Sequence, residues 1–172
     1  MRLWLRDRWC EIEEQPVAFL RVMTARVKYE IDVLMPGYTH LRRAQSIRWS
    51  HWIFNYGSAF VTDLERLREF IKRIDRSPLG SGTLVGNLFG IDRDAIAKNL
   101  GFDGTINNSM AAIVDRDFVV EALQWSATLM QRILRGAEDL ILYSTAKFGF
   151  VRLADAYSTG SNLMPQRRNL TP

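Results

Sequence analysis

The longest uninterrupted pattern in this sequence is helical and runs from about Asn108 to Lys147. Its apolar residues recur at steps of three and four, as one face of an α-helix requires. At 1.5 Å per residue this stretch would be a rod of about 60 Å, whereas a compact chain of 172 residues should be only about 40 Å across. We therefore expect a long-helix bundle whose apolar seam is covered by another chain. A kink at Gly136 would shorten the rod without removing that need.

Three further stretches have helical periodicity, at about residues 3–34, 46–74 and 92–100. Pro16 interrupts the first, and because a proline inside a helix costs about 3 kcal/mol, a break or kink is expected near Glu14. Asp92 is a suitable N-cap for the short third helix. With 47% hydrophobic residues the chain can bury one core, so we predict a single all-α helical domain.

The charge and cysteine content exclude several classes of protein. The 23 Lys and Arg residues are interleaved with 19 Asp and Glu residues, so no unopposed basic face indicates nucleic-acid binding. The single cysteine, Cys10, excludes an internal disulfide and is typical of a reducing compartment. No signal peptide is recognisable at the N-terminus, and no apolar run approaches the roughly 20 residues that a membrane span needs. We therefore expect a cytosolic protein with no membrane association.

Many polar groups gather between the first two helices, in the segment from Met35 to Gln45. Pro36 and Gly37 predict a turn there. His40 has an ordinary pKa of about 6.5, which suits a general acid or base, although a histidine that only hydrogen-bonds the next helix is an equally good interpretation. The other histidine, His51, falls in an aromatic helical face and is predicted to be packed.

A glycine-rich segment follows the second helix, at residues 77–87. It lacks the Gly-Lys-Ser/Thr ending of a phosphate-binding Walker loop, and no predicted strand precedes it as a dinucleotide fingerprint requires. Its glycines are instead predicted to let the backbone approach an anion or another helix closely.

The C-terminal segment at residues 155–169 is small and polar and then cationic. Hydroxyls beside guanidiniums suit the capture of carboxylate or phosphate oxygens, although a disordered tail has the same composition. Its run Gly160-Ser161-Asn162-Leu163-Met164-Pro165-Gln166-Arg167-Arg168-Asn169, together with Pro36-Gly37-Tyr38-Thr39-His40-Leu41, resembles the paired signatures of the fumarase/aspartase superfamily. The closer similarity is to argininosuccinate lyases and the related delta-crystallins, and it spans nearly the whole chain.

That resemblance implies an all-helical homotetramer built around a bundle of long helices, with each active site assembled from three subunits. Residues 1–172 would be part of the central helical domain, with the signature loop at 157–169. The implied reaction is the reversible β-elimination of argininosuccinate to arginine and fumarate, with no metal and no organic cofactor. It would place the protein in arginine biosynthesis or the urea cycle.

The resemblance also assigns roles to individual residues. Three are implied as catalytic, with Ser161 as the base, His40 as part of the acid and substrate-orienting set, and Arg167 as the charge that stabilises the intermediate. Four are implied to bind substrate, and these are Thr39, Gln45, Arg116 and Asn169. A serine is a very weak base, so Ser161 would need cationic neighbours.

Some positions depart from the family pattern. Asn162 stands where the family has a second serine, and Arg167 stands where it has a lysine. The N-terminal signature and the glutamate after the loop have no counterpart, so we expect a partial chain that is a poor enzyme alone. The alternative is a non-enzymatic assembly protein, either crystallin-like or a pseudo-subunit that joins full-length family members. A preference for adenylosuccinate or for a fumarase-type substrate also stays open, although the residues from Tyr38 to Leu41 favour argininosuccinate.

Overall fold

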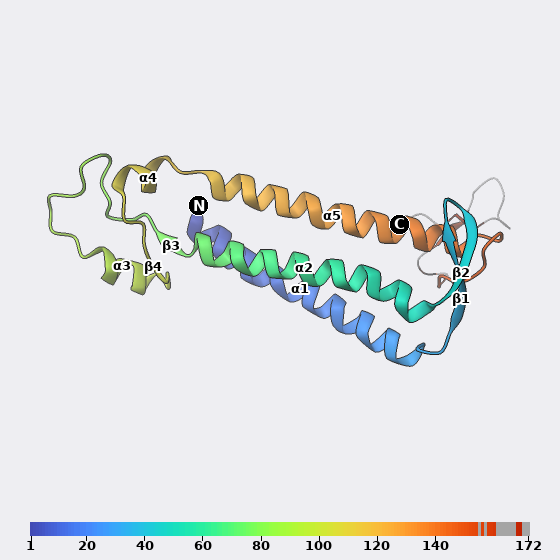
Figure 1. The fold of residues 1–172 in the computed structure, drawn as a ribbon. Coiled ribbons are helices and arrows are strands. Elements are labelled where there is room, and N and C mark those ends of the chain that lie inside the picture. Colours follow the sequence, from blue (N-terminus) through green and yellow to red (C-terminus); the bar gives the residue numbers. More distant parts are fainter. Residues whose placement is uncertain (155, 157, 161–167, 170–172) are drawn as a thin grey trace.

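Three long helices lie along one another and give the molecule an elongated shape (Figure 1). They are α1 (Arg2–Tyr29), α2 (Trp49–Ile74) and α5 (Asp117–Ser144) in the computed structural model, which describes residues 1–154, 156, 158–160 and 168–169. The predicted helical class is confirmed. At one end lie the short helices α3 (Arg93–Asn99) and α4 (Ser109–Val114) and the two-residue strands β3 (Arg76–Ser77) and β4 (Gly104–Thr105).

The first helix runs unbroken through Pro16, so of the predicted break or kink near Glu14 the break is wrong. The local cost of the proline is outweighed by packing, because Pro16 is itself buried, as are Trp9 and Val27 on the same helix. The helix also ends at Tyr29, several residues earlier than predicted.

The long rod is shorter than predicted because it is interrupted after α4. Asp115 adopts an extended conformation with ψ of 127° and ends that helix, and Arg116 then occupies the N-cap position of α5 without a capping side-chain hydrogen bond. The Asp115 carboxylate accepts a hydrogen bond from the Asp117 amide at 2.9 Å and also pairs with Arg2 on α1. A helix of 28 residues remains, about 42 Å long, and it passes through Gly136 without interruption.

The segment predicted as a Pro36–Gly37 turn is a β-hairpin instead. Strand β1 (Leu34–Thr39) pairs antiparallel with β2 (Arg42–Arg48), so α2 begins at Trp49 rather than near residue 46. The turn lies at His40 and Leu41, whose φ angles are 51° and 61°. Two adjacent residues with positive φ are the signature of a type I′ turn, whose twist matches that of the paired strands.

The core is a cluster of large side chains where α1, α2 and α5 meet. The indole ring of Trp9 lies edge-on to Phe70 and Trp125, with ring centroids 5.5 and 4.9 Å away. Asp63 is buried beside this cluster, where Arg66 and Arg132 pair with its carboxylate and the Trp125 indole donates to its backbone carbonyl at 2.7 Å. The other members of the core are Leu5, Leu64, Leu67, Ile74, Phe118 and Ala122.

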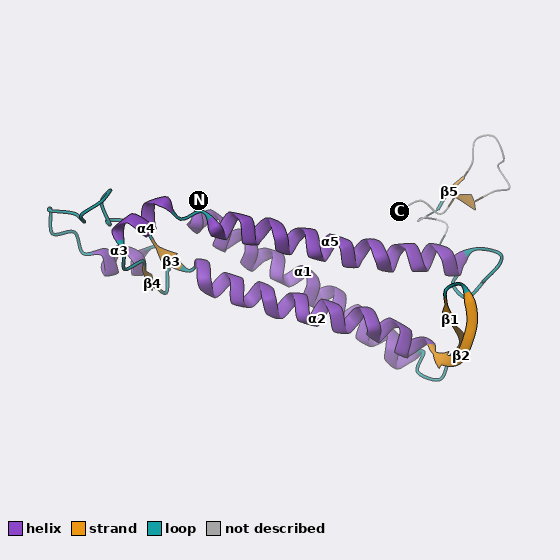
Figure 2. Ribbon diagram, turned by 45° about the horizontal axis from the view of Figure 1, so that its top comes forward, coloured by secondary structure: helices purple, strands orange, loops and turns teal. Residues whose placement is uncertain are grey.

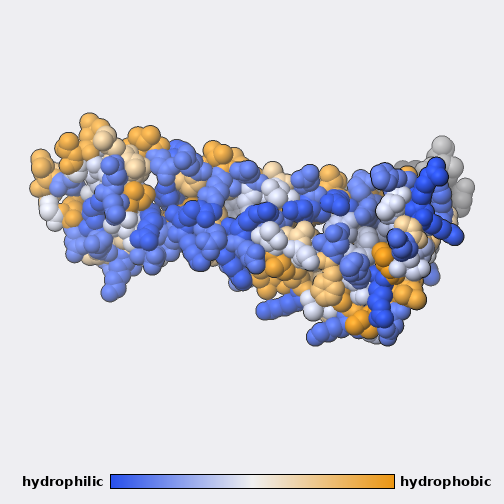
Figure 3. All heavy atoms as spheres, viewed as in Figure 1, coloured by the Kyte–Doolittle hydropathy of each residue, from blue (hydrophilic) through white to orange (hydrophobic). Residues whose placement is uncertain are grey.

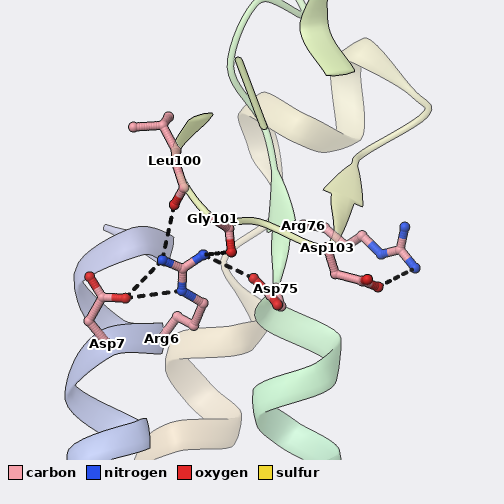
Figure 4. A network of polar contacts seen from close by, with 7 residues as sticks. All are labelled: Arg6, Asp7, Asp75, Arg76, Leu100, Gly101 and Asp103. Atoms are coloured by element: carbon pink, nitrogen blue, oxygen red, sulfur yellow. Dashed lines mark hydrogen bonds and ion pairs between the residues drawn. The ribbon is translucent and has the colours of Figure 1, made fainter. Parts of the chain in front are cut away.

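Arg6 holds α3 against the ends of α1 and α2 (Figure 4). Its guanidinium donates to the backbone carbonyls of Leu100 and Gly101 at 3.1 and 2.7 Å, and to the Asp75 carboxylate at 3.1 Å. The same group lies over the Phe102 ring at 4.6 Å. As predicted, Asp92 caps α3, since its carboxylate accepts from the Ala95 amide at 2.9 Å.

The surface carries apolar side chains at the α3–α4 end, visible as an orange group in Figure 3. The loop that precedes α3 contributes most of them, and its Val85, Leu88 and Phe89 side chains are all about nine-tenths exposed, at 92%, 96% and 89%. None of the described helices is both long enough and apolar enough to cross a membrane.

Candidate functional site

The hairpin lies across the C-terminal end of α5 and the first turn of α2 (Figure 2). A pocket of about 520 Å³ opens between these three elements. Both histidines of the chain, His40 and His51, lie on its wall. Its remaining lining residues are Gly37, Tyr38, Thr39, Leu41, Ala44, Gln45, Ile47, Trp52, Asp139, Leu142, Tyr143 and Phe148.

Aromatic rings hold the hairpin against the end of α5. The Tyr38 ring on β1 lies edge-on to Phe148 at 5.0 Å between centroids. Phe148 also contacts Tyr143, at 6.0 Å, and Tyr143 contacts Trp52 on α2 at 5.3 Å. The pocket therefore has a packed aromatic floor beneath an exposed, polar hairpin.

A Tyr–Asp pair joins α2 to α5 below the pocket. The Tyr56 hydroxyl donates a hydrogen bond to Oδ2 of Asp139. Burial, and then the hydrogen bond to Asp139, raise the pKa of the Tyr56 phenol above its ordinary value. Burial, and then the negative charge of Asp139, also raise the pKa of Tyr143. Both phenols are therefore held in the neutral form around this carboxylate.

Three of the predicted site residues come together at this pocket. Thr39, His40 and Gln45 all lie on its wall, and all three are exposed. His40 sits at the tip of the hairpin in a left-handed conformation that costs a non-glycine residue about 1–2 kcal/mol. Such a position presents the imidazole to a ligand, and no described residue hydrogen-bonds its ring.

Arg116 does not join them. It lies at the N-terminus of α5, whose 28 residues put the two ends about 42 Å apart, and the pocket is at the other end. Its guanidinium donates to the backbone carbonyls of Ile113 and Asp115 at 2.8 and 2.7 Å. In a single chain Arg116 and His40 therefore cannot contact one ligand.

The predicted catalytic residues Ser161 and Arg167 lie outside the described residues. Asn169 belongs to strand β6 (Arg168–Asn169), which pairs antiparallel with β5 (Thr159–Gly160). The backbone partner of Asn169 is Thr159.

Sequence reasoning missed two residues of the pocket. His51 was predicted to be packed, but it is exposed and lines the pocket, so that prediction is wrong. It lies in the first turn of α2, whereas the residues of α2 that belong to the core cluster begin at Leu64. Asp139 was not predicted as a site residue, because its place on the pocket wall depends on how α5 packs against α2. Among the described residues, no group of three or more His, Cys, Asp or Glu side chains could hold a metal ion.

Comparison with known proteins identifies the family. A family model described as "Lyase" matches residues 1–171 of the chain. The chain belongs to this lyase family. Its curated relatives within the lyase family include the argininosuccinate lyase of Candida albicans, which is 54% identical over 169 residues, and that of Chlamydomonas reinhardtii, which is 47% identical over 169 residues. Each alignment covers 98% of this chain but only 36% of the relative, so the chain spans about a third of the length of these proteins.

Solved lyase structures have the same arrangement of helices. An EDDS lyase in complex with formate superposes with a TM-score of 0.93 at 28% identity, covering 98% of this chain and 34% of that one. A class II fumarase from Schistosoma mansoni superposes with a TM-score of 0.76 over 92% of this chain and 38% of its own. At 16% identity the fumarase shows the fold alone. The fold is thus that of the helical domain of the fumarase/aspartase superfamily.

Proposed function

We propose that this chain forms part of a carbon–nitrogen lyase that cleaves argininosuccinate reversibly to arginine and fumarate. The observation that carries the proposal is the grouping of Thr39, His40 and Gln45 on one pocket wall. The resemblance to argininosuccinate lyases implies roles in substrate binding or catalysis for these same three residues. The identity of 54% to the Candida albicans argininosuccinate lyase supports the same substrate.

The elimination needs three chemical groups. A base removes a weakly acidic proton beside a carboxylate, fixed donors stabilise the dianion that results, and an acid protonates the departing nitrogen. His40, exposed at the hairpin tip, is suited to the acid and orienting role, with the Thr39 hydroxyl and the Gln45 amide as substrate contacts. We assign the base to Ser161 and the charge that stabilises the dianion to Arg167. Proton transfer and charge stabilisation complete this reaction without a metal or an organic cofactor.

The proposed site is shared between chains. Arg116 and His40 lie at opposite ends of α5, so a site that uses both needs at least two copies. We propose a homotetramer in which each site takes residues from three subunits, as the resemblance implies. Asn169 would hold a substrate carboxylate in such a site.

The surface of the three long helices supports association. A groove of about 350 Å³ between α1, α2 and α5 is lined mostly by apolar side chains, among them Phe19, Ile53 and Ile133. Along the outward face of α5, Leu123, Met130 and Leu134 are 67%, 56% and 61% exposed. The chain exposes 12384 Å², whereas a compact monomer of 19.9 kDa should expose about 8,700 Å². Association with other copies would cover much of this excess.

The cellular setting follows from the chemistry. A cytosolic location is proposed, since Cys10 is a free, exposed thiol of the kind that a reducing compartment maintains. The non-enzymatic alternative is not favoured, because the relatives quoted above are named as argininosuccinate lyases.

The proposal is tested by following fumarate formation from argininosuccinate. The purified chain is assayed alone and after mixing with Candida albicans argininosuccinate lyase whose loop serine, matching Ser161, has been changed to alanine. Light scattering reports whether mixed oligomers form. A parallel mixture contains the chain with Ser161→Ala.

Turnover by the chain alone, or in the mixture but not in the Ser161→Ala mixture, would support the proposed lyase function. Absence of fumarate in mixtures that do contain hybrid oligomers would overturn the catalytic assignment. Absence of both fumarate and hybrids would overturn the shared site as well.

A further inference from the structure

The hairpin pocket contains one permanently charged side chain among its lining residues, that of Asp139. The other polar side-chain groups on the wall are the two imidazoles, the Thr39 hydroxyl, the Gln45 amide, the Trp52 indole N–H and two phenols. The lining side chains thus include one carboxylate and no permanent cation, which suits a positively charged ligand group. The Arg43 guanidinium is not one of them, although it lies 3.3 Å from the Tyr38 hydroxyl.

One oxygen of the Asp139 carboxylate remains available to a ligand. Oδ2 accepts the hydrogen bond from Tyr56, which lies behind it on α2 and is only 7% exposed. Within the described part of the chain, Oδ1 has neither a hydrogen-bond donor nor an ion-pair partner. The Tyr56 contact therefore fixes the carboxylate through Oδ2, and because Asp139 lines the pocket, Oδ1 is the oxygen that a bound ligand could use.

The surroundings of Asp139 favour a planar cation. Trp52 and Tyr143 line the same pocket, with their ring centroids 5.3 Å apart, and Phe148 lies 6.0 Å from Tyr143. A guanidinium group stacks on aromatic faces while it donates to a carboxylate, whereas an ammonium group is a compact and strongly hydrated charge. A carboxylate beside three aromatic rings thus selects guanidinium over ammonium.

We propose that Asp139, held by Tyr56, forms the guanidinium subsite of this pocket. The subsite rests on the proposed function only for the identity of its natural ligand, which would be the guanidinium of argininosuccinate and of the product arginine. That group is the leaving group of the elimination. Asp139 would thus orient the leaving group against the α5 wall and direct the succinate half toward the hairpin.

The subsite is tested by binding, without turnover. Arginine is compared with citrulline, its uncharged isostere, and methylguanidine with methylammonium, by NMR titration of the His40 and His51 ring signals in the purified chain. We expect arginine to bind at least about tenfold more tightly than citrulline, as a charge-assisted hydrogen bond provides. Methylguanidine should bind more tightly than methylammonium.

Three substitutions locate the effect. Asp139→Asn keeps the size and the acceptor for Tyr56 but removes the charge, and it should abolish the preference for arginine. Tyr56→Phe keeps the charge and should retain most of that preference. Glu138→Gln removes one charge at an exposed neighbour that does not line the pocket, and it should change nothing.

Equal binding of arginine and citrulline by the unmodified chain, or no binding of any probe, would overturn the subsite. So would an Asp139→Asn variant that keeps the preference. These outcomes are separate from the lyase assay, because an Asp139-dependent preference without fumarate formation would leave the subsite intact and remove the lyase function. If fumarate did form but Asp139→Asn left its inhibition by arginine unchanged, the lyase function would stand and the subsite would be overturned.

Discussion

Gly37 on β1 lies directly against the backbone carbonyl of Gln45 on β2. A Cβ added to Gly37 would stand 2.6 Å from that oxygen, well inside van der Waals contact. The strand pairing is irregular at this point, between Pro36 and Tyr38. Close backbone approach at a bulge is therefore what requires glycine here, rather than the turn predicted from the sequence.

The Gly37→Ala substitution should disturb the hairpin. We expect a loss of about 1–3 kcal/mol in the free energy of unfolding, because neither backbone strand can yield without breaking the pairing. Urea unfolding followed by tryptophan fluorescence would measure it. Gly57→Ala is the matched control, since a Cβ there would meet its nearest neighbour at 3.8 Å. Equal effects of the two substitutions would contradict the contact with Gln45.

The hairpin turn predicts the opposite effect at Leu41. This residue has a φ of 61° and a side chain that is 69% exposed, so it is strained while burying little. Replacing it by glycine should raise the free energy of unfolding by about 1 kcal/mol. Leu41→Ala removes the same side chain but keeps the strain. If Leu41→Ala stabilised the chain as much as Leu41→Gly, relief of backbone strain could not be the cause.

Gly136 offers a stabilising substitution inside α5. A Cβ at this position would lie 3.5 Å from the Tyr56 ring, which is an ordinary contact. Because alanine is favoured over glycine in a helix interior by about 1 kcal/mol, Gly136→Ala should raise the thermal midpoint of unfolding. The larger Gly136→Val should lower it by forcing the ring away. A lower midpoint for the alanine variant would show that α2 and α5 are closer than the structure has them.

Alkaline pH should destabilise the fold through Tyr56. Its pKa is raised in the folded chain, mainly by burial and then by Asp139, so the unfolded chain loses its proton first, near its ordinary pKa of about 10. The stability that Tyr56 contributes is therefore complete below about pH 10 and is lost as the pH rises above it. Thermal midpoints measured through this range should fall less steeply in Tyr56→Phe. Tyr29→Phe, at a site that is 86% exposed, should follow the parent curve, and an identical slope in both variants would refute the assignment.

Arg6 should contribute more to stability than a fully exposed arginine does. Its side chain is only 13% exposed and joins Asp75 to two carbonyls at the end of α3. Arg6→Ala should cost about 2–3 kcal/mol, because the partly buried Asp75 carboxylate and Leu100 carbonyl lose a charged donor. Arg8→Ala, which breaks an exposed pair with Glu11, should cost less than about 1 kcal/mol. Hydrogen exchange at the α3 amides would show whether the Arg6 loss is local, and comparable costs for the two variants would contradict the Arg6 network.

The helices could be predicted because the apolar residues of a packed helix recur at regular steps along the sequence. Their ends could not. Asp115 and Arg116 fit a helical pattern locally, and the chain breaks there because Asp115 bonds the Asp117 amide and pairs with Arg2 more than a hundred residues away. The hairpin was missed because its turn is His40-Leu41, without the Asn-Gly pair that marks most type I′ turns.

The site was predictable only where its residues are close in sequence. The polar segment from Met35 to Gln45 was predicted to hold site residues, and its Thr39, His40 and Gln45 do lie on one pocket wall. Asp139 reaches the same pocket from a helix almost a hundred residues later, and only the packing of α5 against α2 brings it there.

The apolar outward face of α5 changes how substitutions in this chain should be interpreted. Leu123 and Leu134 are both more than half exposed. A prediction of mutational effects that uses the burial of residues in a single chain would therefore rank substitutions there as harmless. In the assembly proposed above these side chains are interior. A Leu123→Lys replacement should then leave the folding of the isolated chain untouched and still abolish its biological activity. The structure of one copy of the molecule would give no sign of this defect.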